Sequence, residues 1–358
     1  MLREDLKTVR GILAKKKEVG TRLRESAAWC RPGVWLIEGP YARFKDAQLP
    51  EGLRDAIRGI RTRRASRELV ERAAPPWLVN VTASGGDDAP NCSIGYLSNG
   101  GNWKLFDLDN QVIWTRLAHP ERLARDKANF DRFSVYFNIP AWRVVEMDDG
   151  PWRSEAYIAD ANLVHSSSAT RVEVLKTLLE QYVLFARREA RPADPALTAA
   201  AIATLGECAP GSIPARVAER FADAMAILGE CIQLLPAHGD LSAQNVFVCG
   251  GQPWIIDWDT AGEYQPLLHD LLYLVLREAE LGRTDLLTAY LEGVFDEGLR
   301  RMFSLCDLSA PPCDNLVLLV HSYIVRFHTC RRANHRDANR QNVESLWNRL
   351  QPACAGHL

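Results

Sequence analysis

The sequence lacks the features that identify several classes of protein. Its nine cysteines are scattered and include no C-x-x-C pair, so neither a disulfide framework nor a zinc site is predicted and reduced thiols are expected. No uninterrupted apolar run is long enough to span a bilayer, and the N-terminus has no apolar signal-peptide core. A formal net charge of −2 gives no overall nucleic-acid signature. We therefore expect a cytoplasmic protein that binds no nucleic acid.

Positive charge is nevertheless concentrated near the N-terminus. Residues 1–75 contain 18 Lys+Arg against 10 Asp+Glu. Apolar spacing predicts a helix over 1–28, with Lys15, Lys16 and Lys17 on its exposed side, and a second, arginine-rich helix over 51–73. The second helix would suit peripheral contact with an anionic lipid surface or an acidic partner. The alternative is a solvated helix packed on the rest of the protein.

Short strand-like segments accompany and follow this basic region. They are predicted at 34–37, 93–97, 103–108, 111–117, 142–147 and 152–158. The turn after the second of them contains Ser98, Asn99, Gly100 and Gly101, and glycines in such a turn let backbone N–H groups approach phosphates closely. The same residues also make an ordinary hairpin turn, so the turn alone does not identify a nucleotide site.

The remainder of the chain has mainly helical periodicity. Helices are predicted from Pro120 to about residue 137, and over 171–189, 214–235, 269–280, 284–304, 314–333 and 341–352. A chain of 358 residues with these elements is long enough for two lobes. We therefore expect an α+β protein in which a small sheet precedes a helical region.

One hairpin-like stretch combines acids and an amide with two short apolar runs. His238, Asp240 and Asn245 precede the run Val-Phe-Val, a Gly-Gly turn follows, and the run Trp-Ile-Ile leads into Asp257 and Asp259. Phosphoryl transfer needs a carboxylate at the attacking hydroxyl and oxygen ligands for Mg²⁺. We predict Asp240 as the base and Asn245 and Asp257 as metal ligands, with Asp259 as a neighbouring acid of the metal site. The alternative is a hairpin whose acids cap turns and face solvent.

The same stretch carries a resemblance to a known family. The order His-Gly-Asp-Leu, three residues, Asn, and then Ile-Asp-Trp-Asp, one residue, Ala-Gly, resembles the aminoglycoside phosphotransferase and choline kinase family, relatives of the protein kinases. Ser242 is a departure, because the family often has His there. The resemblance covers about residues 92–275, and more loosely the helices that follow.

This resemblance implies a two-lobed protein-kinase-like fold. A small antiparallel-sheet N-lobe that binds the nucleotide would span 92–162, and a mainly helical C-lobe with the catalytic loop and acceptor site would span 163–358. Residues 1–91 would form a basic, partly helical extension that packs on the N-lobe. The turn at 98–101 resembles the family's glycine-containing loop between the first two strands.

The resemblance also implies a role in nucleotide binding for two charged residues. Arg116 stands where protein kinases place a phosphate-binding lysine, and choline-kinase-like members also have Arg at this point. The alternative for Arg116 is an ordinary surface arginine on a strand. Asp126 matches the helix acid, usually Glu, that would pair with Arg116.

Four further residues receive roles in the base-binding and catalytic segments. Glu155 and Tyr157 lie in a segment that resembles the hinge, whose backbone would hydrogen-bond the purine base of ATP or GTP. His238 is expected to be a packed, hydrogen-bonded organiser of the catalytic loop. Asp270 resembles an acid that orients this loop, the alternative being an acid in the first turn of a helix.

Together with these residues, the resemblance implies an Mg²⁺-dependent kinase that moves the γ-phosphoryl group of ATP or GTP to a hydroxyl of a small molecule. Residues 260–358 contain 12 Asp+Glu and 10 Lys+Arg, with an arginine-rich segment at 326–340, which does not suit a polycationic aminoglycoside. A sugar, glycan or other neutral-to-anionic alcohol is therefore the preferred acceptor. The alternatives are an antibiotic phosphotransferase and a nucleotide-binding pseudokinase with a regulatory or scaffolding role.

Overall fold

The computed structural model describes residues in both halves of the chain. The described residues are 2–38, 40–47, 77–82, 89–98, 101–147, 150–160, 162–192, 219, 233–305, 315, 318 and 319. The chain divides into an N-terminal unit, Met1–Arg125 with Pro140–Ala161, and a C-terminal unit, Asp126–Ile139 with Asn162–Leu358. The helices expected over 51–73, 314–333 and 341–352 lie outside the described residues, apart from 315, 318 and 319.

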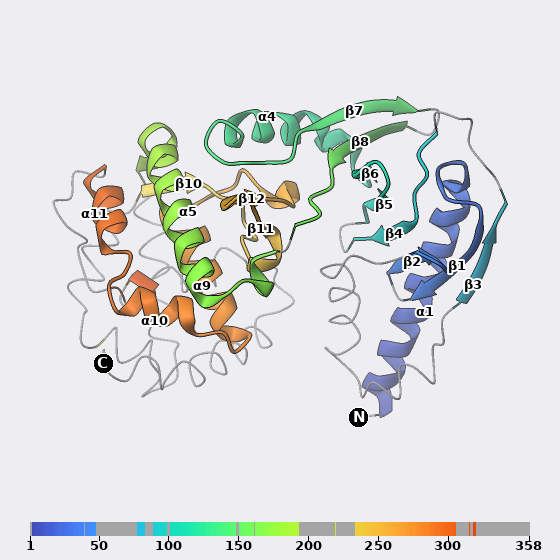
Figure 1. Ribbon diagram of the computed structural model, residues 1–358, viewed down its shortest axis with the longest axis horizontal. Helices are drawn as coiled ribbons and strands as arrows, with labels where there is room; N and C mark the ends of the chain where they lie inside the picture. Colours follow the sequence, from blue (N-terminus) through green and yellow to red (C-terminus); the bar gives the residue numbers. More distant parts are fainter. Residues whose placement is uncertain are drawn as a thin grey trace. The chain divides into compact units, whose positions relative to one another are not determined.

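The N-terminal unit is built on one eight-stranded antiparallel sheet (Figure 1). Its strand order is β3-β1-β2-β4-β5-β6-β8-β7. The strands are β1 (Gly33–Glu38), β2 (Tyr41–Phe44), β3 (Trp77–Val81), β4 (Ile94–Leu97), β5 (Trp103–Asp107), β6 (Val112–Arg116), β7 (Trp142–Met147) and β8 (Gly150–Ala156). All six predicted strands are present, and the sheet is larger than expected because β1, β2 and β3 from the first 91 residues join it.

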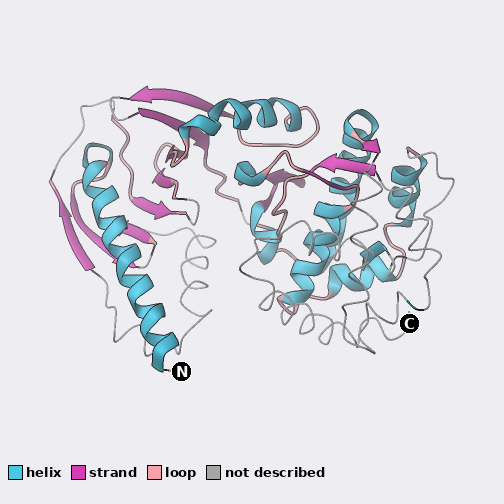
Figure 2. Cartoon of the chain, turned by 180° about the vertical axis from the view of Figure 1, so that it is seen from behind, coloured by secondary structure: helices cyan, strands magenta, loops and turns pink. Residues whose placement is uncertain are grey.

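Helix α1 (Leu2–Glu25) lies against this sheet (Figures 1 and 2). Val19 and Leu23 on the helix pack with Trp35, Ile37 and Trp103 on the strands, and all five are at most 1% exposed. Burial of this apolar surface holds the helix in place. The expectation of an exposed lysine run is wrong at one position, since Lys16 is 2% exposed.

The C-terminal unit is mainly helical (Figure 2). Its helices are most of α4 (Leu123–Phe133), α5 (Ser168–Glu189), α9 (His269–Glu280), α10 (Asp285–Leu291) and α11 (Asp296–Ser304). Its strands form the hairpin β11 (Val246–Cys249) and β12 (Gln252–Ile255), and a small sheet of β13 (Tyr264–Pro266), β10 (Gln233–Pro236) and β9 (Arg191–Pro192). Apolar side chains of α5, α9, α10 and α11 form its core.

Three predicted helices differ substantially from the structure. The helix predicted from Pro120 begins as a 3-10 turn and, as α4, ends at Phe133. The single helix predicted over 284–304 is two helices, α10 and α11, because Gly293 between them has a φ of +80°. Residues 233–235 belong to strand β10, which pairs with β13, so the helix predicted over 214–235 does not extend that far.

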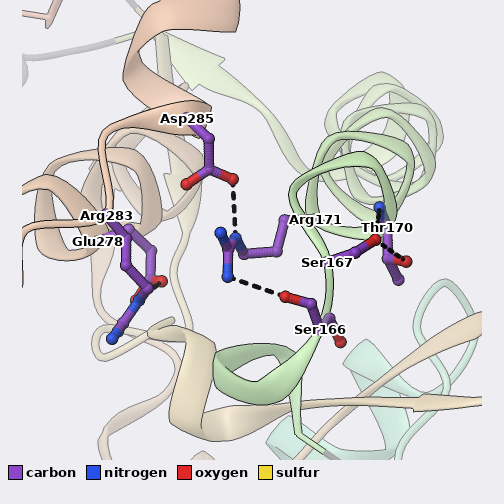
Figure 3. Close-up of polar contacts among 7 residues, drawn as sticks. All are labelled: Ser166, Ser167, Thr170, Arg171, Glu278, Arg283 and Asp285. Carbon is purple, nitrogen blue, oxygen red and sulfur yellow. Dashed lines mark hydrogen bonds and ion pairs between the residues drawn. The ribbon is translucent and has the colours of Figure 1, made fainter.

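Two ion pairs lie among the helices of the C-terminal unit (Figure 3). Arg171 on α5 donates from Nε to Asp285 at the start of α10 (2.8 Å) and from Nη1 to the carbonyl of Ser166 (3.0 Å). Arg283, between α9 and α10, donates to both carboxylate oxygens of Glu278 at 2.5 and 2.8 Å. Since Glu278 is only 1% exposed, this bidentate pair compensates a carboxylate buried in the helical core.

Loss of the Arg283 guanidinium is therefore expected to destabilise the C-terminal unit. Arg283→Ala leaves the Glu278 carboxylate buried without its partner, at a cost of about 3 kcal/mol. Lys176→Ala, which removes an exposed pair with Glu173 on α5, is the matched control and should change stability by less than about 0.5 kcal/mol. Urea unfolding of both variants measures the difference, and equal losses would contradict the role given to Glu278.

The architecture confirms the predicted α+β fold, with an antiparallel sheet in the first part of the chain and helices in the second. The compact units do not coincide with the segments 1–91, 92–162 and 163–358, so that functional division stays a prediction. None of the described helices is both long enough and apolar enough to cross a membrane.

Candidate active site

A buried carboxylate fixes the loop that follows β10. Asp270, in the first turn of α9, accepts hydrogen bonds from the backbone N–H groups of His238 (2.7 Å) and Gly239 (3.0 Å). Its Oδ2 also accepts from the Tyr182 hydroxyl at 2.8 Å. Burial and the adjacent Asp270 charge raise the pKa of Tyr182, so its hydroxyl remains a donor. With Asp270 only 3% exposed, these charge-assisted bonds hold the loop in one conformation.

His238 links this loop to the end of β12. Its ring is fully buried, with Nε2 2.9 Å from the carbonyl oxygen of Ile256 and Nδ1 3.3 Å from the backbone N of Asp240. Because a carbonyl only accepts, Nε2 carries the proton and Nδ1 accepts from Asp240. The ring also meets Trp258 edge to face, with centroids 4.6 Å apart. This placement fits the organising role expected of His238.

Glycine is required between His238 and Asp240. Gly239 has a φ of +87°, and a Cβ there would lie 3.1 Å from Thr260 Oγ1 and 3.2 Å from the Thr260 carbonyl oxygen. The Thr260 hydroxyl also donates to the carbonyl of His238 at 3.0 Å. The chain therefore turns sharply at Gly239, and the next side chain, Asp240, is exposed.

The Asp240 carboxylate is oriented by α9. Its Oδ1 accepts a hydrogen bond from the hydroxyl of Tyr273, with 2.7 Å between the oxygens. Tyr273 follows Asp270 by one helical turn, so the same face of α9 holds both the loop backbone and its carboxylate. Asn245 Nδ2 donates to the carbonyl of Asp240 at 2.9 Å and fixes the loop from its other end. Oδ2 is thus the oxygen of Asp240 that has no hydrogen bond from Tyr273.

Arg277 and Glu280 lie beyond Tyr273 on α9. Burial disfavours the charge of Arg277, but its hydrogen bond to Glu280 and the nearby Tyr273 and Asp240 raise its pKa above the ordinary value. Arg277 is therefore charged and within electrostatic range of Asp240. Because Glu280 pairs with Arg277, the two charges cancel beside the Asp240 carboxylate.

Removal of the Tyr273 hydroxyl tests this orientation. Tyr273→Phe keeps the ring but loses the hydrogen bond to Asp240, and we expect turnover to fall roughly tenfold because a hydrogen bond to a charged group contributes about 1.5 kcal/mol. Tyr264→Phe, on β13, is a matched control, with its ring against Arg191. The measurement is kcat for both variants, and unchanged turnover in Tyr273→Phe would remove Tyr273 from the site.

The predicted metal ligands lie at the two ends of the β11–β12 hairpin. The backbone of Asn245, just before β11, accepts from the N–H of Ile256 at 3.0 Å and joins these ends. Since Asn245 Nδ2 is bonded to Asp240, its amide oxygen is the atom available to a cation. Asp257, exposed, follows Ile256 with φ 64° and ψ 53°, a left-handed conformation that costs an ordinary residue about 1 kcal/mol. Asp259, half-buried, belongs to the following 3-10 turn Trp258–Thr260.

These residues fit magnesium better than a transition metal. In the described part of the chain, no three His, Cys, Asp or Glu side chains are grouped to hold a metal by themselves. The set Asn245, Asp257 and Asp259 offers only hard oxygen ligands, and Mg²⁺ commonly combines one or two carboxylates with phosphate oxygens and water. The left-handed Asp257 is an observed strained position of the kind found at functional sites.

The predicted phosphate-side residues lie at one end of the N-terminal sheet. Ser98 and Asn102 close the turn after β4 through a backbone hydrogen bond of 2.9 Å, and Gly101 in this turn has a φ of +84°. Asn99 and Gly100 lie outside the described residues. Arg116 ends β6, and its Nη1 is 3.1 Å from Glu25 Oε2. The pairing of Arg116 with Asp126 stays a prediction.

The predicted hinge comprises the end of β8 and the residue that follows it. Glu155 lies 3.6 Å from Arg153, and the Tyr157 ring packs edge to face on Phe106. The backbone N–H of Tyr157 donates to the carbonyl of Gln111 at 2.8 Å, so that N–H is already used within the protein. Recognition of a purine base by this segment therefore has to use other backbone groups.

Helix α4 is fixed against the segment that follows Asp259. Asn129 Nδ2 donates to the carbonyl of Ala261 at 2.7 Å. Gly262 has a φ of +101°, and a Cβ on it would lie 2.6 Å from the Asn129 amide atoms. The glycine of the Asp-x-Ala-Gly motif thus permits close packing with α4.

Sequence reasoning missed four residues of these networks: Tyr273, Tyr182, Asn129 and Glu25. Tyr273 had a detectable signal, because it lies three residues after Asp270 on a helix that was correctly predicted. Tyr182 and Glu25 contact partners 88 and 91 residues away, which no local pattern reveals.

Comparison with known proteins gives one family match. The family model described as "Phosphotransferase enzyme family" matches residues 116–303. No curated protein sequence is significantly similar to the chain.

Several solved structures are similar at low sequence identity. A glucosamine kinase in complex with glucosamine, ADP and inorganic phosphate is 16% identical, with a TM-score of 0.42 over 71% of this chain and 81% of that one. An aminoglycoside phosphotransferase from Alicyclobacillus acidocaldarius is 12% identical, with a TM-score of 0.44 over 73% and 90%. A thermostable mutant aminoglycoside phosphotransferase with ADP and hygromycin B is also 12% identical, with a TM-score of 0.44 over 70% and 88%.

Proposed function

Because this chain belongs to the phosphotransferase enzyme family, we propose that it moves the γ-phosphoryl group of ATP or GTP to a hydroxyl of a small molecule, with Mg²⁺ as cofactor. The family membership confirms the resemblance seen in the motifs and establishes a kinase-like phosphotransferase. The acceptor, the magnesium requirement and the residue roles are the proposed part.

One observation carries the catalytic assignment. The buried Asp270 fixes the loop backbone on both sides of Gly239, while the Asp240 carboxylate is exposed and held at Oδ1 by Tyr273. A fixed, solvent-accessible carboxylate is what a catalytic base requires. We assign Oδ2 of Asp240 as the proton acceptor.

The proposed reaction forms one bond, breaks one bond and moves one proton. The acceptor's hydroxyl oxygen forms a bond to the γ-phosphorus, the bond from that phosphorus to the β–γ bridging oxygen breaks, and the nucleoside diphosphate leaves. Asp240 takes the hydroxyl proton. Asn245 and Asp257 would hold Mg²⁺, with Asp259 beside them, and the bound ion supplies positive charge to the phosphate oxygens.

Charge around Asp240 supports a neutral-to-anionic acceptor. Arg277 lies within electrostatic range of Asp240 and pairs with Glu280, so a positive charge accompanies the acids on this side of α9. A polycationic aminoglycoside is recognised best by a surplus of carboxylates. A sugar or a related alcohol therefore fits these residues better. The arginine-rich segment at 326–340 lies outside the described residues.

The acceptor is tested by a nucleotide-consumption screen with ATP and GTP. One panel holds neutral and anionic sugars and the other holds aminoglycosides, and mass analysis identifies any product that has gained a phosphoryl group. We expect turnover with members of the sugar panel. Turnover of aminoglycosides alone would overturn the acceptor preference while leaving the reaction type intact.

A further inference from the structure

Helix α1 contacts the end of the N-terminal sheet that carries Arg116 and the turn after β4. This helix lies outside the segment that the family model matches. That segment begins at Arg116, whereas α1 ends at Glu25. Strand register places Arg116 opposite Trp103 on β5 and opposite Trp152 on β8. Directly paired residues of antiparallel strands point to the same face, so Arg116 projects from the face that carries these tryptophans.

The face that carries Arg116 is also the face that α1 covers. Trp103 and Trp152 belong to the buried cluster that includes Val19 and Leu23 of α1. The Trp103 indole N–H donates to Ser26 Oγ at 3.1 Å, directly after the helix. Burial of these apolar side chains fixes the end of α1 beside the end of β6.

Three charged side chains of α1 extend from this packed position toward the predicted phosphate-binding elements. Glu25 Oε2 accepts from Arg116 at 3.1 Å and from Arg22 at 3.3 Å. Lys15 Nζ donates to the carbonyl of Ser98, at the start of the turn after β4, at 3.1 Å. Lys15 and Arg22 are seven residues apart and so lie on the same side of the helix.

The charges at this end of the sheet favour an anion. Three cationic side chains lie here, because Arg116 and Arg22 both donate to Glu25 and Lys15 donates to the turn after β4. Arg116 and Glu25 have side chains that are 27% and 44% exposed, so their ion pair contributes little to stability. Its main consequence is to restrict the long Arg116 side chain to one region.

We propose that α1 contributes to the nucleotide site. Glu25, at the end of this helix, positions the Arg116 guanidinium for the phosphates of the bound nucleotide. This inference rests on the proposed function. Glu25 acts through Arg116 and is a positioning residue. The sequence had assigned this role to Asp126 alone.

Titration of ATP·Mg²⁺ and of adenosine into the full-length protein tests the proposal. We expect Glu25→Gln to weaken ATP binding roughly fivefold and to leave adenosine binding unchanged, since only the phosphates contact Arg116. Arg116→Ala should weaken ATP binding more, and the double variant should be no weaker than Arg116→Ala alone. Glu18→Gln, another exposed acid of α1, is the matched control.

A charge exchange separates positioning from a structural role. The double variant Glu25→Arg, Arg116→Glu exchanges the two charges, and its melting temperature should stay near that of the wild type because this exposed pair contributes little to stability, but its ATP affinity should be lost. Unchanged ATP affinity in Glu25→Gln, or additive losses in the double variant, would overturn the proposal while wild-type ATP binding left the proposed function standing. Absence of ATP binding by the wild type would remove both.

Discussion

Replacement of Asp240 by asparagine is expected to abolish turnover and to leave nucleotide binding nearly unchanged. The amide of Asn cannot accept the acceptor's proton as a carboxylate does, and loss of a positioned base lowers kcat by about 10³-fold. The loop should keep its shape, because Asp270 binds the backbone of His238 and Gly239 and not the Asp240 side chain. The measurement is kcat with a substrate from the acceptor screen, alongside the affinity for ATP·Mg²⁺.

Asp259→Asn is the matched comparison for Asp240→Asn, because it makes the same chemical change in the neighbouring 3-10 turn. A smaller loss in Asp259→Asn would show that the effect depends on position and not on the loss of one negative charge. Equal kcat in Asp240→Asn and the wild type would remove Asp240 from its role as base.

Replacement of Asp257 should have the second largest effect. Asp257→Asn would weaken the proposed metal ligand without disturbing the backbone, since asparagine also tolerates the left-handed conformation that Asp257 adopts. We expect turnover to fall by at least about a hundredfold at fixed Mg²⁺, with part of the loss recovered at higher Mg²⁺ concentration. The dependence of kcat on Mg²⁺ concentration measures both expectations.

A backbone control separates the two properties of Asp257. Asp257→Gly relieves the left-handed strain and removes the carboxylate, so it should be at least as inactive as Asp257→Asn without being less stable. An unaltered Mg²⁺ dependence in both variants would contradict the assignment of Asp257 as a ligand.

The β11–β12 hairpin was predictable because its information is local. The apolar runs of β11 and β12, the Gly-Gly turn and the acids around them lie close together in the sequence, so their spatial order follows from hairpin geometry. Helix α9 was predicted with its correct ends, His269 and Glu280. The interaction of Asp270 with the loop was expected only from the family resemblance.

Long-range packing was not predictable from the sequence. Strands β2 and β3 gave no clear alternating pattern, so the size of the N-terminal sheet was underestimated. Lys16 was expected on a wet surface because of its charge, yet the face of α1 that packs on the sheet includes it. Glu25, which pairs with Arg116, lies 91 residues before it, so no local pattern indicated this contact, and the pairing of Arg116 with Asp126 stays a prediction.

Calorimetric titration of ATP into the wild-type protein, with Mg²⁺ and then with EDTA in its place, tests the central claim most directly. The claim is that Asn245 and Asp257 hold Mg²⁺ for a nucleotide whose γ-phosphoryl group is transferred next to Asp240. We predict clear binding with Mg²⁺ and a large loss of affinity in EDTA. Equal affinity in the two conditions, or no binding in either, would contradict it.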